Sequence, residues 1–208
     1  MDGLWVLLLL IFTAALPVLL VYVWFKAANI PLSRRWFLLA LLAGALSLPL
    51  AALMQHFLPL PGGYWGIFIR IALTEELSRL LMVFILFRLK KPAPGAKTGA
   101  ARGAAVGLLA GLGFALVENA YYGAANIGIT LVRSFTAAPL HGACGARIGQ
   151  AAEAIRKAPV RALVRFLSAV AIHGMYNFMI VSPGIAPIFP VLVALFALAA
   201  SVQAIHRT

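Results

Sequence analysis

Long apolar stretches recur along the whole chain, separated by short connections that contain Pro, Gly or charged residues. An α-helix rises 1.5 Å per residue, so about 20 apolar residues cross a hydrocarbon core about 30 Å thick. Seven stretches are close to this length, and each predicts a membrane-spanning helix. They cover residues 3–25, 35–56, 64–87, 103–122, 129–147, 162–181 and 186–205. The pattern therefore predicts an all-α, polytopic membrane helix bundle.

The composition points to the same class of protein. Hydrophobic residues make up 63% of the 208 residues and charged residues only 11%, with a mean hydropathy of +1.01. The first stretch begins with Asp2 in place of basic residues and is too long for a signal peptide, so we expect a retained span. The connections are short and leave no room for a second, soluble domain. We therefore expect a single integral membrane domain over residues 1–208, with a core at about 64–181.

The basic residues alternate between connections, and the net charge is +12. In or beside the first, third and fifth connections and at the chain end lie Lys26, Arg34, Arg35, Arg88, Lys90, Lys91, Lys97, Arg102, Arg147, Arg156, Lys157, Arg161, Arg165 and Arg207. The connections near 57–63, 123–128 and 182–185 contain no Lys or Arg. By the positive-inside rule, this pattern predicts an N-terminus outside and a C-terminus in the cytoplasm. Topology thus accounts for the charge without a nucleic-acid partner.

Polar side chains inside the predicted spans are the main functional signal. An ionisable group there costs a few kcal/mol or more unless it is paired or faces a polar cavity. The carboxylates, imidazoles and amides in question are Glu75, Glu76, Glu118, Asn119, His141, His173 and Asn177. Counted at 1.5 Å per residue from the outer helix ends, the carboxylates and imidazoles lie about 6–18 Å deep. Because four different helices place them in one band, we expect them to converge on one polar cavity.

Arg79 lies within reach of two adjacent glutamates in the stretch LTEELSRLLMVF. Glu75 precedes it by four residues, which is the favourable order for a helical ion pair. Glu75 and Glu76 point about 100° apart, so we expect one to pair with Arg79 while the other faces the cavity. A purely structural Glu75–Arg79 pair is the alternative. Arg133 is placed either to balance Glu118 or to snorkel towards the interface.

Small residues predict a close helix crossing. Gly103, Gly107 and Gly111 repeat every four residues in the run GAAVGLLAGLGF, a pattern that lets a neighbouring helix approach closely. His141 lies in a similarly small-rich run, PLHGACGARIG, and is therefore expected at a tight crossing. The single cysteine, Cys144, excludes an intrachain disulfide, and we expect it to be a small buried side chain.

Four short motifs resemble, in order, those of the PrsW-type intramembrane proteases, a branch of the group that includes the CAAX prenyl endopeptidases and bacteriocin-processing proteins. The motifs are EELSR, GFALVENAYY, RSFTAAPLHGACGARIG and HGMYN, within and around residues 75–177. Each is weak alone, but four in order on separate predicted helices are fairly specific. Glu118, four residues after Phe114, stands where the CAAX proteases have histidine, which resembles the PrsW branch. Arg79 stands where many PrsW members have lysine.

The resemblance implies an intramembrane endopeptidase that cleaves a membrane-anchored protein, such as an anti-sigma factor, in a bacterial inner membrane. The estimated depth of the polar residues predicts a cut near the outer half of the bilayer. The catalytic residues that it implies are Glu75, Glu76, Glu118, His141 and His173, with support from Arg79, Asn119, Asn177 and Arg133. By resemblance to the CAAX-type motif, Glu75 is the water activator. The expected partners are this protein substrate and the lipid bilayer.

Peptide hydrolysis requires an activated nucleophile and a group that stabilises the oxyanion. No serine or cysteine has a clear base partner at suitable depth, so we expect the nucleophile to be water. In one mechanism His141, His173 and Glu118 bind Zn²⁺, and another carboxylate is the base. In the other no metal is bound, and a buried glutamate takes the proton from water while His173 and Asn177 hold the carbonyl oxygen. The residues leave both mechanisms open, and the resemblance favours the metal.

A non-enzymatic membrane protein is the second class of function. A scaffold or a proton-coupled carrier would use the same buried charges, since relay carboxylates and histidines also mark transport paths. The sequence has no internal repeat of the kind that transporter halves show, which makes transport the weaker alternative. Cleavage of a membrane-anchored reporter peptide discriminates between the two classes.

Overall fold

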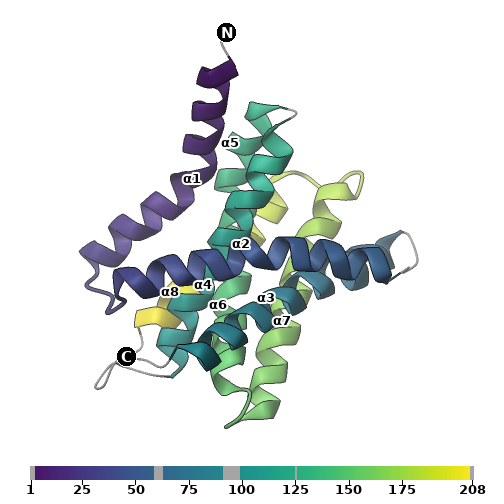
Figure 1. The fold of residues 1–208 in the computed structure, drawn as a ribbon. Helices are drawn as coiled ribbons and strands as arrows, with labels where there is room; N and C mark the ends of the chain where they lie inside the picture. The colour runs from purple at the N-terminus through teal and green to yellow at the C-terminus, as the bar shows by residue number, and fades with distance from the viewer. Residues whose placement is uncertain (1–2, 59–62, 91–98, 125, 207–208) are drawn as a thin grey trace.

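The computed structural model describes residues 3–58, 63–90, 99–124 and 126–206, and every regular element within these ranges is helical. The elements are α1 (Gly3–Ala27), α2 (Arg34–Phe57), the π-helix η1 (Gly66–Leu73), α3 (Thr74–Leu89), α4 (Ala100–Gly123), α5 (Ile127–Phe135), α6 (Ala137–Ala154), α7 (Pro159–Val181) and α8 (Ile188–His206). Many large apolar side chains of α1, α2, α7 and α8 are exposed on the outside, as suits contact with lipid. The all-α prediction is confirmed (Figure 1).

The helices α4 and α6 lie at the centre of the bundle and pack antiparallel against each other (Figure 1). A Cβ atom on Gly107 would lie only 2.0 Å from the carbonyl oxygen of Gly145, and one on Gly111 only 1.9 Å from that of His141. No larger side chain fits into these spaces, so the predicted close crossing at His141 is confirmed. Cys144, also on α6, is buried as expected.

Among the described residues, five helices are long and apolar enough to cross a membrane: α1, α2, α4, α7 and α8. The other two predicted spans are each divided between two elements. Residues 64–87 form η1 and most of α3, and residues 129–147 form part of α5 and of α6, with a break at Thr136. The chain is thus an integral membrane protein. The count of seven spans and the N-terminus-outside orientation stay predictions.

The start of α3 is held in place by its neighbours, and this matters because two glutamates follow immediately. Gln55 on α2 donates a hydrogen bond from Nε2 to Thr74 Oγ1 at 3.1 Å. The preceding π-helix packs against α7, where a Cβ atom on Gly174 would lie 2.2 Å from Cδ1 of Phe68. These contacts on both sides fix the first turn of α3 relative to α2 and α7.

Several residues used for the topology prediction lie outside the described ranges. They are Asp2, Lys91, Lys97 and Arg207, together with most of the 90–102 linker and part of the 57–63 loop. Among the described basic residues of the connections, Lys26, Arg34 and Arg156 are exposed, as expected for residues near helix ends.

Candidate active site

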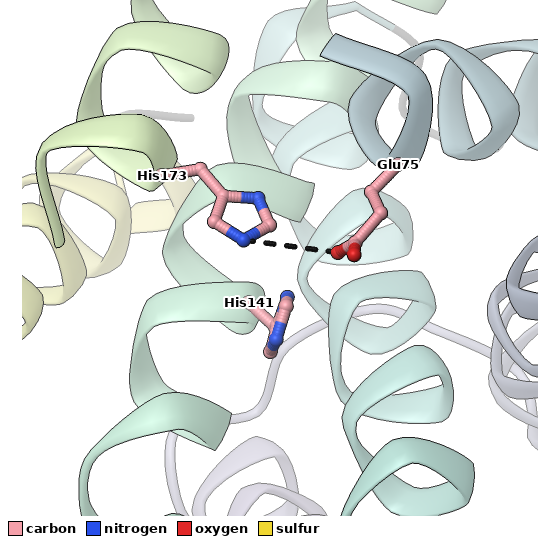
Figure 2. A group of neighbouring side chains, drawn as sticks. All are labelled: Glu75, His141 and His173. Carbon is pink, nitrogen blue, oxygen red and sulfur yellow. Dashed lines mark ion pairs between the residues drawn. The ribbon is translucent and has the colours of Figure 1, made fainter. Parts of the chain in front are cut away.

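Four of the five predicted catalytic residues line one cavity of about 400 Å³. Glu75 comes from the start of α3, Glu118 from the last turns of α4, His141 from α6 and His173 from α7. Figure 2 shows the carboxylate of Glu75 and the ring of His173 pointing towards each other, with the ring of His141 close to both. Glu76 is fully buried and does not line the cavity. The structure therefore brings together the carboxylates and imidazoles that the sequence singled out.

Glu76 holds both Arg79 and His173 in position. Arg79 Nη1 donates to Glu76 Oε2 at 2.5 Å, and His173 Nδ1 lies 2.8 Å from Glu76 Oε1. An ionised carboxylate only accepts hydrogen bonds, so Nδ1 of His173 donates and its Nε2 lone pair is left for the cavity. The alternative of a structural Glu75–Arg79 pair is wrong, because Arg79 pairs with Glu76 while Glu75 faces the cavity.

His141 lies between Arg79 and Glu118. Its Nδ1 is 3.4 Å from Arg79 Nη2, and its Nε2 is 2.9 Å from Glu118 Oε2. A guanidinium only donates, so Nδ1 accepts and the Nε2–H group donates to the Glu118 carboxylate. Arg133 donates from Nη2 to the same carboxylate and from Nε to Asn119 Oδ1, the latter at 2.9 Å. The structure thus places Arg133 against Glu118, and it connects Asn119 to the site through Arg133.

Glu75 presents an unpartnered oxygen near the two imidazoles. Its Oε2 atom is buried and has no hydrogen-bond partner among the described residues. Glu75, His141 and His173 each offer one ligand atom, and these three atoms lie within 4.8 Å of one another. One carboxylate and two imidazoles form a common donor set for a catalytic zinc ion. Because the unpartnered oxygen is free to ligate, the residues present fit a metal ion.

This donor set differs from the one that the sequence suggested. Glu118, the predicted third ligand, is engaged by hydrogen bonds within the site, and Glu75 instead joins the two imidazoles. Both ring nitrogens of His141 have hydrogen-bond partners, so ligation by His141 requires one of them to be released. His173 needs no such change, because a carboxylate that holds Nδ1, here Glu76, is the usual way to orient a ligating imidazole.

Other polar side chains also line the cavity. Asn177 was predicted from the sequence and lies one helical turn from His173. Gln55, Tyr122 and Tyr176 line the cavity too, and the sequence analysis missed them. Gln55 is a lone amide near the end of a predicted span, and the criterion that selected Asn177, a polar side chain within an apolar stretch, would also have selected it. The tyrosines carry no comparable signal, since aromatic residues are common near membrane interfaces.

The fold brings carboxylates and imidazoles from four helices together around one cavity inside an apolar membrane bundle. A sequence model of the family described as PrsW family intramembrane metalloprotease matches residues 32–201. This match extends over most of the chain, so the protein belongs to the PrsW family and is an intramembrane protease. Comparisons with curated proteins and with solved structures found no match.

Proposed function

We propose that the protein hydrolyses a peptide bond of a membrane-anchored protein, with water activated beside Glu75 and the two histidines. The main support is the unpartnered Oε2 of Glu75, which lies 3.7 Å from Nε2 of His173 in a buried site. This separation is longer than a hydrogen bond, so both groups are available to a water molecule or to a substrate carbonyl.

In the metal-free version of this mechanism, His173 and Asn177 are the proposed stabilisers of the oxyanion. Glu76 holds Nδ1 of His173, so a proton taken up by this ring resides on Nε2, which faces the cavity. A protonated Nε2 donates to the negative oxygen that forms in the transition state, and the Asn177 amide lies on the same cavity wall. Arg79 contributes indirectly, because its positive charge stabilises the ionised form of Glu76 and so keeps that carboxylate a hydrogen-bond acceptor.

Zn²⁺ is the metal that we propose for the donor set of Glu75, His141 and His173. A zinc ion bound there would polarise the scissile carbonyl and make a coordinated water more acidic. Glu118, which is hydrogen-bonded to His141, is then the carboxylate that remains to accept a proton. In the metal-free alternative Glu75 itself accepts the proton. Both versions require the same cavity and the same oriented His173.

The proposed substrate is a protein anchored in the bacterial inner membrane, such as an anti-sigma factor. The likeness to PrsW-type proteases supports this choice. The position of Glu118 supports a cut in the outer half of the membrane, since it lies five residues, or about 7.5 Å, before the end of α4 at Gly123. Membership of a protease family favours this function over a scaffold or a proton-coupled carrier.

The test uses purified protein in lipid vesicles with a membrane-anchored reporter peptide. We expect cleavage by the wild-type protein, close to one metal ion per chain, and loss of cleavage with a chelator that added zinc restores. A His173→Ala variant serves as the inactive control. Cleavage that persists after complete metal removal would establish the metal-free mechanism, and equal cleavage by the His173→Ala variant would contradict the proposed site.

A further inference from the structure

A second cavity, of about 290 Å³, lies at the turn between α6 and α7, and it shares no lining residue with the active site. This turn is at the bottom of Figure 1. Lys157, Arg161 and Arg165 line the cavity. They are spaced four residues apart, so Arg161 and Arg165 lie on the same face of α7. All three side chains are exposed, and like charges at this spacing repel each other, so an anion bound between them would be favourable.

The described part of the chain does not supply that anion. Its acidic residues are the three glutamates of the active site and Glu153, while Asp2 lies outside the described ranges. Glu153 lines this second cavity but is already engaged. It accepts a hydrogen bond from the Gly99 N–H group at 3.2 Å and lies 3.7 Å from the guanidinium of Arg102. No ion pair among the described residues therefore reaches the three basic side chains of the cavity.

A buried neutral donor lies beside these cations. Gln150 lines the cavity, is only 8% exposed, and has no side-chain hydrogen bond within the described part of the chain. Its amide nitrogen can therefore donate to an acceptor bound in the cavity. Two guanidinium groups, an ammonium and an amide around one cavity form a donor set that matches the oxygens of a phosphate group.

The surface next to the cavity favours a lipid as the source of a phosphate bound there. Apolar side chains on α7 around the two arginines are well exposed: Val160, Leu163, Val164 and Leu167. Arg165 lies six residues into α7 from Pro159, about 9 Å along the helix axis. A phosphate held at this depth in a membrane helix has acyl chains beside it. Basic pockets between membrane helices bind anionic lipid headgroups in the same way.

We propose that this cavity binds the phosphate of an anionic phospholipid, with the acyl chains of the lipid along the exposed apolar face of α7. The site depends on residues remote from the catalytic centre, so its occupancy is independent of the proposed proteolysis. Phosphatidylglycerol is a suitable probe because its headgroup is a phosphodiester with no compensating cation.

The test is native mass spectrometry of the full-length protein in detergent, titrated with phosphatidylglycerol, phosphatidylcholine and inorganic phosphate. We expect phosphatidylglycerol to bind more tightly than phosphatidylcholine. An Arg161→Gln/Arg165→Gln variant should lose about 30-fold in affinity for phosphatidylglycerol. The control is Arg34→Gln/Arg35→Gln, which removes an exposed basic pair that lines none of the cavities described and should change the affinity less than about 2-fold.

Equal affinity for the two lipids, or an equal loss in the Arg34/Arg35 control, would overturn the proposal, because either result means unspecific attraction to a basic surface. Displacement of phosphatidylglycerol by an equal concentration of inorganic phosphate would assign the cavity to a free anion and also overturn it. If the double variant does not fold, the single Arg161→Gln variant tests the same point with an expected loss of about 5-fold.

Discussion

Adjacent glutamates at the start of α3 are expected to respond in opposite ways when each is changed to glutamine. Glu76→Gln removes the counter-charge of Arg79, which is fully buried and has Glu76 as its ion-pair partner. Breaking a buried pair by removing one partner costs about 3–5 kcal/mol. At about 2–4 °C per kcal/mol for a chain of this size, the Tm should fall by about 6–20 °C.

Glu75→Gln should instead leave the fold intact. The Oε2 atom of Glu75 has no hydrogen-bond partner among the described residues, so the amide loses no bond there. Glutamine keeps the shape of the side chain but is a poor metal ligand and does not accept a proton from water. We therefore expect the cleavage rate to fall about 10²–10⁴-fold, whether Glu75 is the base or a ligand.

Both variants are compared with the wild type by initial rates of reporter cleavage in vesicles and by thermal unfolding in detergent. Glu153→Gln is the matched control, since its ion pair with Arg102 is 3.7 Å long and partly exposed and should contribute less than about 1 kcal/mol. A Glu76→Gln protein as stable as the wild type would show that Arg79 has another partner. Full activity in both the Glu75 and Glu76 variants would exclude this cavity as the protease site.

Three further predictions concern packing, the outer side of the site and topology. Gly107→Ala should destabilise the bundle by about 1–3 kcal/mol or more in the thermal unfolding assay, because its Cβ atom would lie 2.0 Å from an α6 carbonyl oxygen. Gly142→Ala is the control and should be tolerated, since the nearest atom to its Cβ would be 3.5 Å away. Arg133→Gln should lower the cleavage rate about 10–100-fold, because Arg133 holds the carboxylate of Glu118, and Arg133→Lys should recover part of this loss. An unchanged rate would mean that Arg133 only anchors the helix at the membrane interface. Reporter fusions at residues 95 and 155 should report cytoplasm and one near 60 should not, and the reverse result would invert the topology.

The apolar stretches of the sequence predict most of the helices, because the length needed to cross a bilayer is a strong constraint on composition. They do not predict where a helix is interrupted. The break at Thr136 and the π-helix before α3 leave the apolar pattern unchanged, since a local change of backbone hydrogen bonding needs no polar residue. Both interruptions therefore became visible only in the structure.

The carboxylates and imidazoles of the candidate site were predictable from the sequence, but their pairing was not. Depth in the membrane is enough to select the glutamates and histidines, since few polar residues occur at that level. Depth does not select the ion-pair partner of Arg79, because side chains three and four residues earlier on a helix are both within its reach. The choice between Glu75 and Glu118 as a third ligand depends on the distances between helices. Those distances are set by how several helices pack together, which no single stretch of sequence specifies.

The backbone contact between α4 and α6 has a mechanical consequence for the enzyme. Where two helices touch backbone to backbone through glycines, few side chains between them can rotate to take up strain, so we expect the pair to move as one stiff body. Glu118 and His141, one on each of these helices, must then move together. Another wall of the cavity is formed by η1 and α7 and includes Ile71 and Ile180, and η1 meets α7 through a side chain, Phe68 against Gly174. We expect the wall formed by η1 and α7 to be the part of the cavity that moves when a bulky polypeptide substrate enters.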